Sequence, residues 1–422
     1  MMPAPQFSTS QGQIAGISVA ELAHRFGTPT FVYDAAVILQ RLADLAAFDV
    51  VRYAQKACSN LAILDLLRQH GARVDAVSAG EIRRALAAGY ATEGPVPPIV
   101  YTADVFDAES LDLCVERRIH VNCGSPDMIE QLGRRAPGRQ VTLRINPGFG
   151  HGHSRKTNTG GDQAKHGIWH TQIGECLALA KRYQLTVTGL HNHIGSGTDL
   201  EHLSLVAAAL EKAALEIGPT LTSLSGGGGL SVPYRPGEES MDLAACFAVY
   251  DAARRRLQER LGHPLRLEIE PGRYLLAESG YLIAEVRAVK QQGANWFYLV
   301  DAGFNNLARP ILYGAYHPMA IVPRPGDGAN RPLRDVIVGG PLCESGDIFT
   351  QSEGGYVAPR PLPDAAVGDF LLIQCAGAYG FVMGSNYNSR PLAAEVLIAD
   401  GQPRLIRHRQ TFEDLIRGEI LA

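Results

Sequence analysis

The sequence predicts an α/β protein in which a (β/α)8 barrel of the TIM type is joined to a second, mainly β domain. Eight short apolar runs recur, with helical stretches between them, from about residue 49 to 270. After about residue 285 the runs are punctuated by Gly and Pro, without long helices. The length of 422 residues also exceeds what one ordinary core accommodates, so two domains are expected.

The eight apolar runs are expected to be the strands of the barrel. Strands that alternate with helices pair in parallel through right-handed crossovers, and eight of them close into a ring. One intervening helix is predicted at EIRRALAAG, with Ile82, Ala85 and Leu86 at helical spacing and Gly89 as its stop. The barrel is assigned to residues 36–284, and its strand sequences in order are VVRYAQ, VDAVS, IVYT, IHVNCG, VTLRIN, VTGLHNH, LTSLSGGGG and LRLEIEP.

The second domain is assigned to residues 1–35 and 285–422. The run PTFVYD, residues 29–34, precedes the barrel and is able to join this β domain. Its other strands are predicted at WFYLVDAG, DVIVGG, GDFLLIQCAGAYG and AAEVLIAD.

Composition and charge argue against several classes of protein. Hydrophobic residues make up 46% and charged residues 19%, which is typical of a globular protein with a substantial core. The net charge of −4 and the lack of basic runs argue against a nucleic-acid partner. There is no pattern of a signal peptide and no apolar run of bilayer length. Seven scattered cysteines without CxxC spacing indicate neither disulfides nor a zinc site, so a cytoplasmic protein is expected.

Polar residues and glycines follow the predicted strands, and in such a barrel the carboxyl ends of the strands share the face where active sites are built. Among them, Lys56 is the first candidate for covalent chemistry, because a neutral amine forms a Schiff base with an aldehyde cofactor. The alternative is a strand-end lysine that reaches solvent. The residues at or just past strand ends are Lys56, Ser78, Asn146, His193, Gly227 and Glu270.

Three further motifs suggest a phosphorylated aromatic cofactor. SGGGGL at 225–230 would let backbone N–H groups approach an anion, although a tight turn is the alternative. In HNHIGSG, His193 is expected to lie flat against an aromatic ring, and Ser196 is expected to donate to a phosphate. The alternative is a histidine that only packs in the core. A metal site is not indicated, because no third ligand with suitable spacing is present. In EPGR, Glu270 is the candidate for the acid that keeps the nitrogen of a pyridine ring protonated. The alternative is that Glu270 and Arg273 form an ordinary ion pair on the surface.

The ordered motifs resemble those of the fold-type III pyridoxal-phosphate decarboxylases, whose fold is like that of alanine racemase. The resemblance spans about residues 26 to 415 and is strongest to the members that act on meso-diaminopimelate. It implies a pyridoxal 5'-phosphate cofactor and the conversion of meso-2,6-diaminopimelate to L-lysine and CO2, the last step of lysine biosynthesis. The motifs that carry it are FGTPTFVYD, AQKACSN, VDAVSAGEI, INPG, GLHNHIGSG, GGGL, EPGR, DAGFNNLARPILY, GPLCESGD and GAYGFVMGSNYNSRP.

The resemblance also implies a role for each residue of the cofactor site. Lys56 would bind the cofactor covalently, His193 would stack on its ring, Glu270 would face the pyridine nitrogen, and Tyr379 would reach it as well. The phosphate would be held by residues of three turns, namely Ser196, Gly228, Gly229, Gly272 and Arg273.

For the substrate, the resemblance implies that Cys343 protonates the α-carbon and that Cys343 and Glu344 come from the neighbouring subunit. An obligate homodimer with shared active sites and no metal follows. A thiol suits proton donation because cysteine pKa values are readily tuned; a buried apolar thiol is the alternative. The expected substrate contacts are Arg273, Arg309, Tyr313, Glu344 and Tyr379.

Alternatives remain open at this point. A decarboxylase of another diamino acid, such as D-lysine, D-ornithine or arginine, would share every cofactor residue. A non-catalytic homologue that only binds a partner would be expected to lose Lys56 or Cys343. Residues 146–168, rich in Gly, Asn, Thr and His, are predicted to form a lid rather than a metal site. His166 and Asn192 depart from the usual pattern of relatives and leave fine specificity open.

Overall fold

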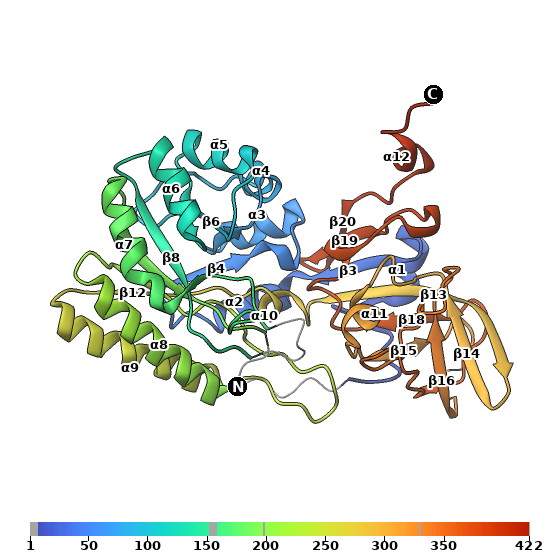
Figure 1. Ribbon diagram of the computed structural model, residues 1–422. Helices are drawn as coiled ribbons and strands as arrows, with labels where there is room; N and C mark the ends of the chain where they lie inside the picture. The colour runs from blue at the N-terminus through green and yellow to red at the C-terminus, as the bar shows by residue number, and fades with distance from the viewer. Residues whose placement is uncertain (1–6, 152–157, 197–198, 329–330, 422) are drawn as a thin grey trace. The chain divides into compact units, whose positions relative to one another are not determined.

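The computed structural model describes residues 7–151, 158–196, 199–328 and 331–421 (Figure 1). Its internal contacts divide the chain into two compact units. The barrel unit comprises Leu39–Ser231 and Met241–Tyr274. The β unit comprises Met1–Ile38, Val232–Ser240 and Leu275–Ala422. The chain thus enters the β unit first, forms most of the barrel, and returns.

Eight parallel strands form the closed ring of the barrel unit. Each pairs with the next along the chain, and β12 pairs with β4 to close the ring. The predicted fold class is confirmed, and each of the eight strands coincides with one predicted run, although β5, β6, β8 and β10 each extend one residue beyond it. A further two-residue strand, β9 (Ile168–Trp169), pairs with β8 and was not predicted. The ring consists of β4 (Val50–Ala54), β5 (Arg73–Ala76), β6 (Ile99–Ala103), β7 (His120–Cys123), β8 (Gln140–Asn146), β10 (Thr186–Asn192), β11 (Ser223–Ser225) and β12 (Arg266–Ile269).

Helices between these strands cover the outside of the ring (Figure 1). Polar caps start several of them; Ser78, for example, accepts the backbone N–H of Glu81 at the start of α4. The predicted helix at EIRRALAAG is confirmed: Ile82 and Ala85 are buried, and Gly89 follows the helix with φ +87°. The helices between the strands are α3 (Leu61–Gln69), α4 (Ala79–Ala87), α5 (Ala108–Glu116), α6 (Pro126–Arg135), α7 (Ile173–Arg182), α8 (Leu200–Ile217) and α9 (Leu243–Leu261). Helix α2 (Ala35–Ala43) precedes the first strand of the ring, and the short α10 (Arg273–Leu276) follows the last.

The interior of the ring is polar at one level. Arg52 and Glu268 form a buried ion pair there, with Arg52 Nη2 2.8 Å from Glu268 Oε2. A cavity of about 100 Å³ is lined by this pair and by His191 and Glu270, among other residues. Charged groups inside a barrel need such partners, because an unpaired buried charge is costly.

The β unit is built around the long strand β13 (Gly280–Gln292). This strand pairs antiparallel with β3 (Thr30–Asp34), β14 (Asn295–Val300) and β18 (Phe370–Ile373). The run that precedes the barrel in sequence is therefore part of this sheet. The remaining strands of the unit are β1 (Gln13–Ile14), β2 (Ile17–Ser18), β15 (Met319–Val322), β16 (Leu333–Gly339), β17 (Arg360–Pro363), β19 (Ala394–Ala399) and β20 (Gln402–Arg407).

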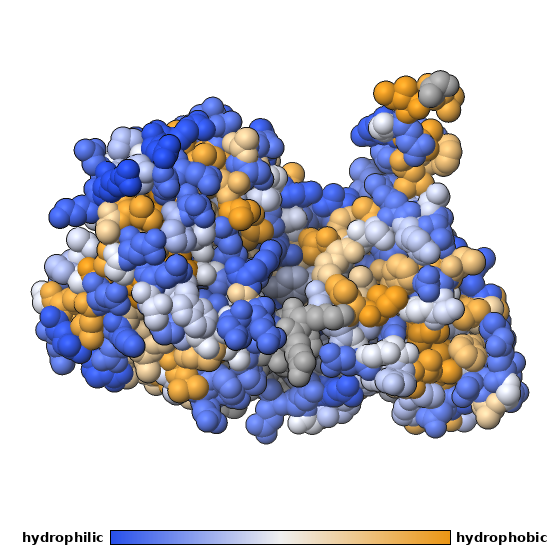
Figure 2. All heavy atoms as spheres, in the orientation of Figure 1, coloured by the Kyte–Doolittle hydropathy of each residue, from blue (hydrophilic) through white to orange (hydrophobic). Residues whose placement is uncertain are grey.

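Short helices and an apolar core complete the β unit. The helices are α1 (Val19–Phe26), α11 (Arg309–Tyr313) and α12 (Phe412–Ile416). Helix α1 packs Val19 and Leu22 onto Val32, Ile283 and Leu372. Near the carboxyl end, by contrast, apolar side chains are exposed, as the orange atoms beyond α12 in Figure 2 show. No helix within the described ranges has the length and apolarity needed to cross a membrane.

Candidate active site

Lys56 and Glu270 lie at the same end of two neighbouring barrel strands. Strand β12 pairs in parallel with β4, with Ile269 opposite Val51. Beyond this pair, the N–H of Ala54 donates to the carbonyl of Pro271 at 3.1 Å. Lys56 follows β4 in a short 3-10 turn, Gln55–Ala57, and its side chain is exposed. The strand is buried, but the amine itself reaches the mouth of the barrel.

A glycine turn after β11 passes between the ends of β10 and β12. Gly227 has φ +65°, and a Cβ there would lie 2.5 Å from the carbonyl oxygen of Asn192. A Cβ on Gly228 would lie 2.4 Å from the carbonyl oxygen of Glu270. Because only glycine fits both positions, the run SGGGGL is needed for this close approach.

The backbone N–H groups of this turn have partners within the chain. Gly226 donates to the carbonyl of Glu268 at 3.1 Å, and Gly227 donates to Ser225 Oγ at 3.2 Å. Gly228 donates to His193 Nδ1 at 3.3 Å. These three amides thus have acceptors within the chain, and the phosphate-binding role of the run, Gly228 included, stays a prediction.

His193 follows β10 and is held as a neutral imidazole. Its Nδ1 accepts the hydrogen bond from Gly228, which leaves the ring proton on Nε2. Burial, with the nearby charges of Arg144 and Lys56, lowers the pKa of His193 well below its ordinary value. An uncharged flat ring at the barrel mouth suits contact with an aromatic cofactor.

Glu270 is a buried carboxylate held on both oxygens. Ser225 Oγ donates to Oε1 at 2.9 Å, and His191 Nε2 lies 2.9 Å from Oε2. The His191 contact is a close polar approach and does not meet the geometry of a hydrogen bond. Burial alone would raise the pKa of Glu270, but His191, Arg52 and the Ser225 hydroxyl lower it to about 2. Glu270 is thus ionised at neutral pH.

Asp75 is a site residue that sequence reasoning missed. It lies in β5, and burial together with the charge of Glu270 raises its pKa to about 6. The charge of Lys56 acts on Asp75 in the opposite direction, so the amine lies within electrostatic reach. The available signal was an acid in the middle of the apolar run VDAVS.

Several buried polar atoms near the mouth have no hydrogen-bond partner within the described parts of the chain. They include Asp75 Oδ1, His191 Nδ1 and Asn192 Oδ1. Buried polar atoms are normally satisfied, so such a group marks a place for a polar ligand or for water. Together with the ionised Glu270 and neutral His193, these atoms fit a pyridine ring with polar substituents.

The residues expected to hold a phosphate follow three barrel strands. Ser196 is half-buried and follows β10, where Gly195 bridges to Asn158. Gly272 and Arg273 are buried and follow β12 at the start of α10. Gly229, with φ +100°, follows β11.

The segment 146–168 is anchored on Asn146 where it is described; its residues 152–157 lie outside the described residues. Asn146 Nδ2 donates to the carbonyls of Gly161 and His166 at 3.0 and 3.1 Å. His166 Nδ1 lies 2.7 Å from Asp104 Oδ2, so His166 contacts the loop after β6. The lid function of this segment stays a prediction.

In the β unit, Arg309 is fixed by neighbouring side chains. Its Nη1 donates to Tyr234 Oη at 3.2 Å and lies 3.0 Å from His317 Nε2. Its guanidinium lies 5.0 Å from the centre of the Tyr234 ring. Arg309 begins α11 and the half-buried Tyr313 ends it, one helical turn later.

Cys343 lies on an exposed loop of the β unit, unlike the six other cysteines, which are buried. Its N–H donates to Asn388 Oδ1 at 2.7 Å. Asp347 accepts the N–H groups of Phe304 and Leu342 at 2.7 and 2.8 Å and so fixes the loop from behind. The alternative of a buried apolar thiol is therefore wrong for Cys343.

Two further residues of the predicted substrate site also lie in the β unit. Glu344 is exposed beside Cys343, and its Oε1 accepts the N–H of Gly346 at 3.4 Å. Tyr379 has φ +57°, a conformation that is strained for a bulky residue and is often kept at functional sites.

Comparisons with known proteins assign the family. The family model described as "Pyridoxal-dependent decarboxylase, pyridoxal binding domain" matches residues 37–277. The diaminopimelate decarboxylase of Escherichia coli (strain K12) is 52% identical over 421 residues, which cover 100% of both chains. That of Streptomyces coelicolor is 54% identical over 409 residues, 97% of this chain and 93% of the relative.

The structural comparison agrees. The structure matches a crystal structure of a diaminopimelate decarboxylase with a TM-score of 0.93 and 52% identity, over 96% of each chain. The family depends on pyridoxal phosphate, and the donor set at the barrel mouth fits that cofactor. The chain belongs to the pyridoxal-dependent decarboxylases, within the group of the diaminopimelate decarboxylases.

Proposed function

We propose that the protein decarboxylates meso-2,6-diaminopimelate to L-lysine and CO2. The main support is the arrangement at the barrel mouth. The ionised Glu270, with one oxygen contacted by Ser225 and the other by His191, lies there together with Lys56 and the neutral His193. The identity of 52 to 54% to diaminopimelate decarboxylases over nearly the whole chain supports the substrate.

The chemistry assigns one task to each of these side chains. Pyridoxal phosphate, when bound, accepts the electron pair that remains when CO2 leaves the α-carbon. Lys56 would hold the cofactor. The negative charge of Glu270 would keep a proton on the pyridine nitrogen, and His193 would support the ring. Cys343 donates one proton to the α-carbon, so the carboxylate lost is replaced by hydrogen.

The far end of the substrate requires cationic and acidic partners. Its second carboxylate suits a guanidinium, and Arg273 and Arg309 are the candidates. Its second amine suits the carboxylate of Glu344, with Tyr313 and Tyr379 as further contacts. A site that pairs this end should reject analogues that lack it by as much as about 10^4-fold, because its own polar groups would be left unpaired.

We also propose a homodimer in which Cys343 and Glu344 of one chain complete the site of the other. The exposed position of this loop supports the proposal, because a proton donor has to reach its substrate. Exposed apolar side chains on the same unit, such as Phe412 at 64% and Ile420 at 92%, offer surface for association. The seven free cysteines are consistent with a reducing cytoplasm, where we place the enzyme.

Mixing two inactive variants tests the shared site. Lys56→Ala and Cys343→Ala homodimers should each be inactive. After random exchange of subunits, half of the dimers carry one intact site, so about a quarter of wild-type activity should return. If each chain supplied its own Cys343, mixing would restore nothing.

A substrate panel tests the reaction itself. The purified enzyme is supplied separately with meso-diaminopimelate, D-lysine, D-ornithine and arginine, and released CO2 is measured. Release from meso-diaminopimelate alone, with L-lysine as product, supports the proposal. Preferential release from another diamino acid would reassign the substrate while leaving the cofactor site unchanged.

A further inference from the structure

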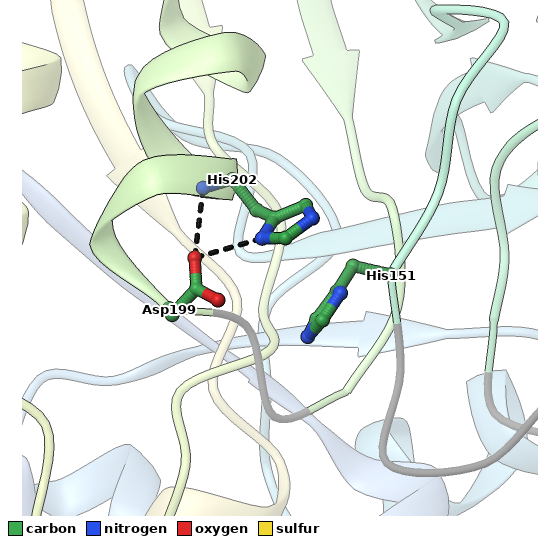
Figure 3. A group of neighbouring side chains, drawn as sticks. All are labelled: His151, Asp199 and His202. Atoms are coloured by element: carbon green, nitrogen blue, oxygen red, sulfur yellow. Dashed lines mark hydrogen bonds and ion pairs between the residues drawn. The ribbon is translucent and has the colours of Figure 1, made fainter.

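We propose that His151, Asp199 and His202 form a binding site for a divalent metal ion of the zinc class. One ligand atom from each residue lies within 4.8 Å of the others. The two imidazole rings are stacked with their centroids 3.8 Å apart. Figure 3 shows all three side chains converging from two separate parts of the chain.

The backbone places these residues independently of their side chains. The N–H of His151 donates to the carbonyl of Ile194 at 3.0 Å, which pins the chain after β8 against the chain after β10. Asp199 is the N-cap of α8, and His202 lies in the first turn of that helix. The ligands would therefore be held by a loop anchor on one side and a helix start on the other.

The carboxylate of Asp199 is already oriented. Its Oδ1 accepts the N–H of His202 at 2.9 Å and lies 2.8 Å from His202 Nδ1. In Figure 3 its second oxygen lies on the side facing His151.

Two imidazoles and one carboxylate are a typical donor set for zinc, with water as the fourth ligand. Imidazole donors favour zinc, cobalt, nickel and copper over magnesium and calcium, which prefer oxygen. Zinc–nitrogen bonds of about 2.0 Å require ligand atoms about 3.3 Å apart. To bind the ion, the two stacked rings would therefore have to rotate so that one nitrogen of each points at the metal. Binding would replace the Asp199–His202 Nδ1 hydrogen bond by metal bonds, with the ring proton moving to Nε2.

A bound ion would connect two segments that flank the barrel mouth. Asp199 lies three residues after Ser196, the predicted phosphate contact, and His151 lies five residues after the end of β8. The ion would thereby restrain both segments. This inference does not depend on the substrate proposed above.

The test is metal binding by the cofactor-loaded, dialysed protein. Titration with Co²⁺ should give the visible absorption of a four-coordinate site with one ion per chain, and Zn²⁺ should displace it. His151→Ala and His202→Ala should each weaken binding at least about tenfold, because each removes one of three protein ligands. His70→Ala removes an exposed histidine of the same unit and should leave binding unchanged.

Two further variants test the alternatives that Asp199 only caps α8 and that the ion binds instead to the thiol of Cys343. Asp199→Asn keeps an oxygen that caps α8 but loses the charge, so it should weaken metal binding without lowering Tm. Cys343→Ser removes the exposed thiol, another zinc ligand, and should retain the ion. Absence of Co²⁺ binding, or binding that survives both histidine substitutions or depends on Cys343, would overturn the inference.

Discussion

His191 Nε2 lies 2.9 Å from Glu270 Oε2, inside the barrel and next to the glycine turn. Sequence reasoning singled out His193 in the motif HNHIGSG but gave His191 no task. The contact assigns it one: His191 positions Glu270 and favours its ionised form. Ser225 supports the other oxygen from β11.

Replacing His191 with Leu should therefore weaken cofactor binding and lower kcat by about 10- to 100-fold, since a contact to a charged group is worth about 1.5 to 3 kcal/mol. Without His191, burial should raise the pKa of Glu270 from about 2. The acid limb of the pH–rate profile should then move to higher pH. Ser225→Ala should shift it in the same direction, whereas an unchanged limb in both variants would refute the positioning role.

Gly228→Ala should destabilise the barrel mouth. The added Cβ would lie 2.4 Å from the Glu270 carbonyl oxygen, so the turn has to move. Overpacking of this kind costs about 1 to 3 kcal/mol and should also displace the partner of His193 Nδ1. Chemical denaturation and cofactor affinity measure the two effects. Gly418→Ala, where a Cβ meets nothing within 4 Å, is the control.

The buried Arg52–Glu268 pair should make stability depend on acidity. Burial raises the pKa of Glu268, but Arg52 and Arg266 lower it below its ordinary value. Its contribution is therefore present above the unfolded pKa of about 4.3 and is lost as the pH falls through the folded pKa.

Glu268→Gln should cost about 3 to 5 kcal/mol in unfolding free energy at pH 7, because it leaves the Arg52 charge buried without its partner. The difference from wild type should shrink below about pH 4. Glu109→Gln breaks an exposed pair with Arg83 and should cost at most about 1 kcal/mol. Equal costs for the two variants would contradict the assignment of a buried pair.

Cys343→Ala should retain the cofactor and lower turnover by about 10^2- to 10^4-fold, because it removes the proton donor. Cofactor absorbance and steady-state rates measure these outcomes separately. Ser345→Ala alters the same exposed loop without removing a thiol and should remain active. A fully active Cys343→Ala enzyme would remove this residue from the mechanism.

The sequence was sufficient for the barrel because its strands are short, mostly buried and largely apolar runs between helical stretches, a pattern that is local. It was also sufficient for the placement of Lys56, His193 and Glu270, since strand ends of a barrel share one face. Local patterns do not report which distant side chains meet. Asp75 and the contacts of Ser225 and His191 with Glu270 therefore became visible only in the folded chain.

The same limit applies to the histidine-rich segment. The sequence shows no carboxylate cluster beside His151, and it does not report that Asp199 and His202, which follow only after β10, lie next to it. The glycine run is a second case, because the sequence does not report that three of its N–H groups donate to acceptors within the chain.

The absorption spectrum of the purified enzyme tests the central claim most directly, since a lysine-bound pyridoxal group absorbs near the visible edge. The wild-type protein should show this band, and Lys56→Ala should lose it while Glu109→Gln keeps it. A band that persists unchanged in Lys56→Ala would contradict the assignment of Lys56 as the residue that holds the cofactor.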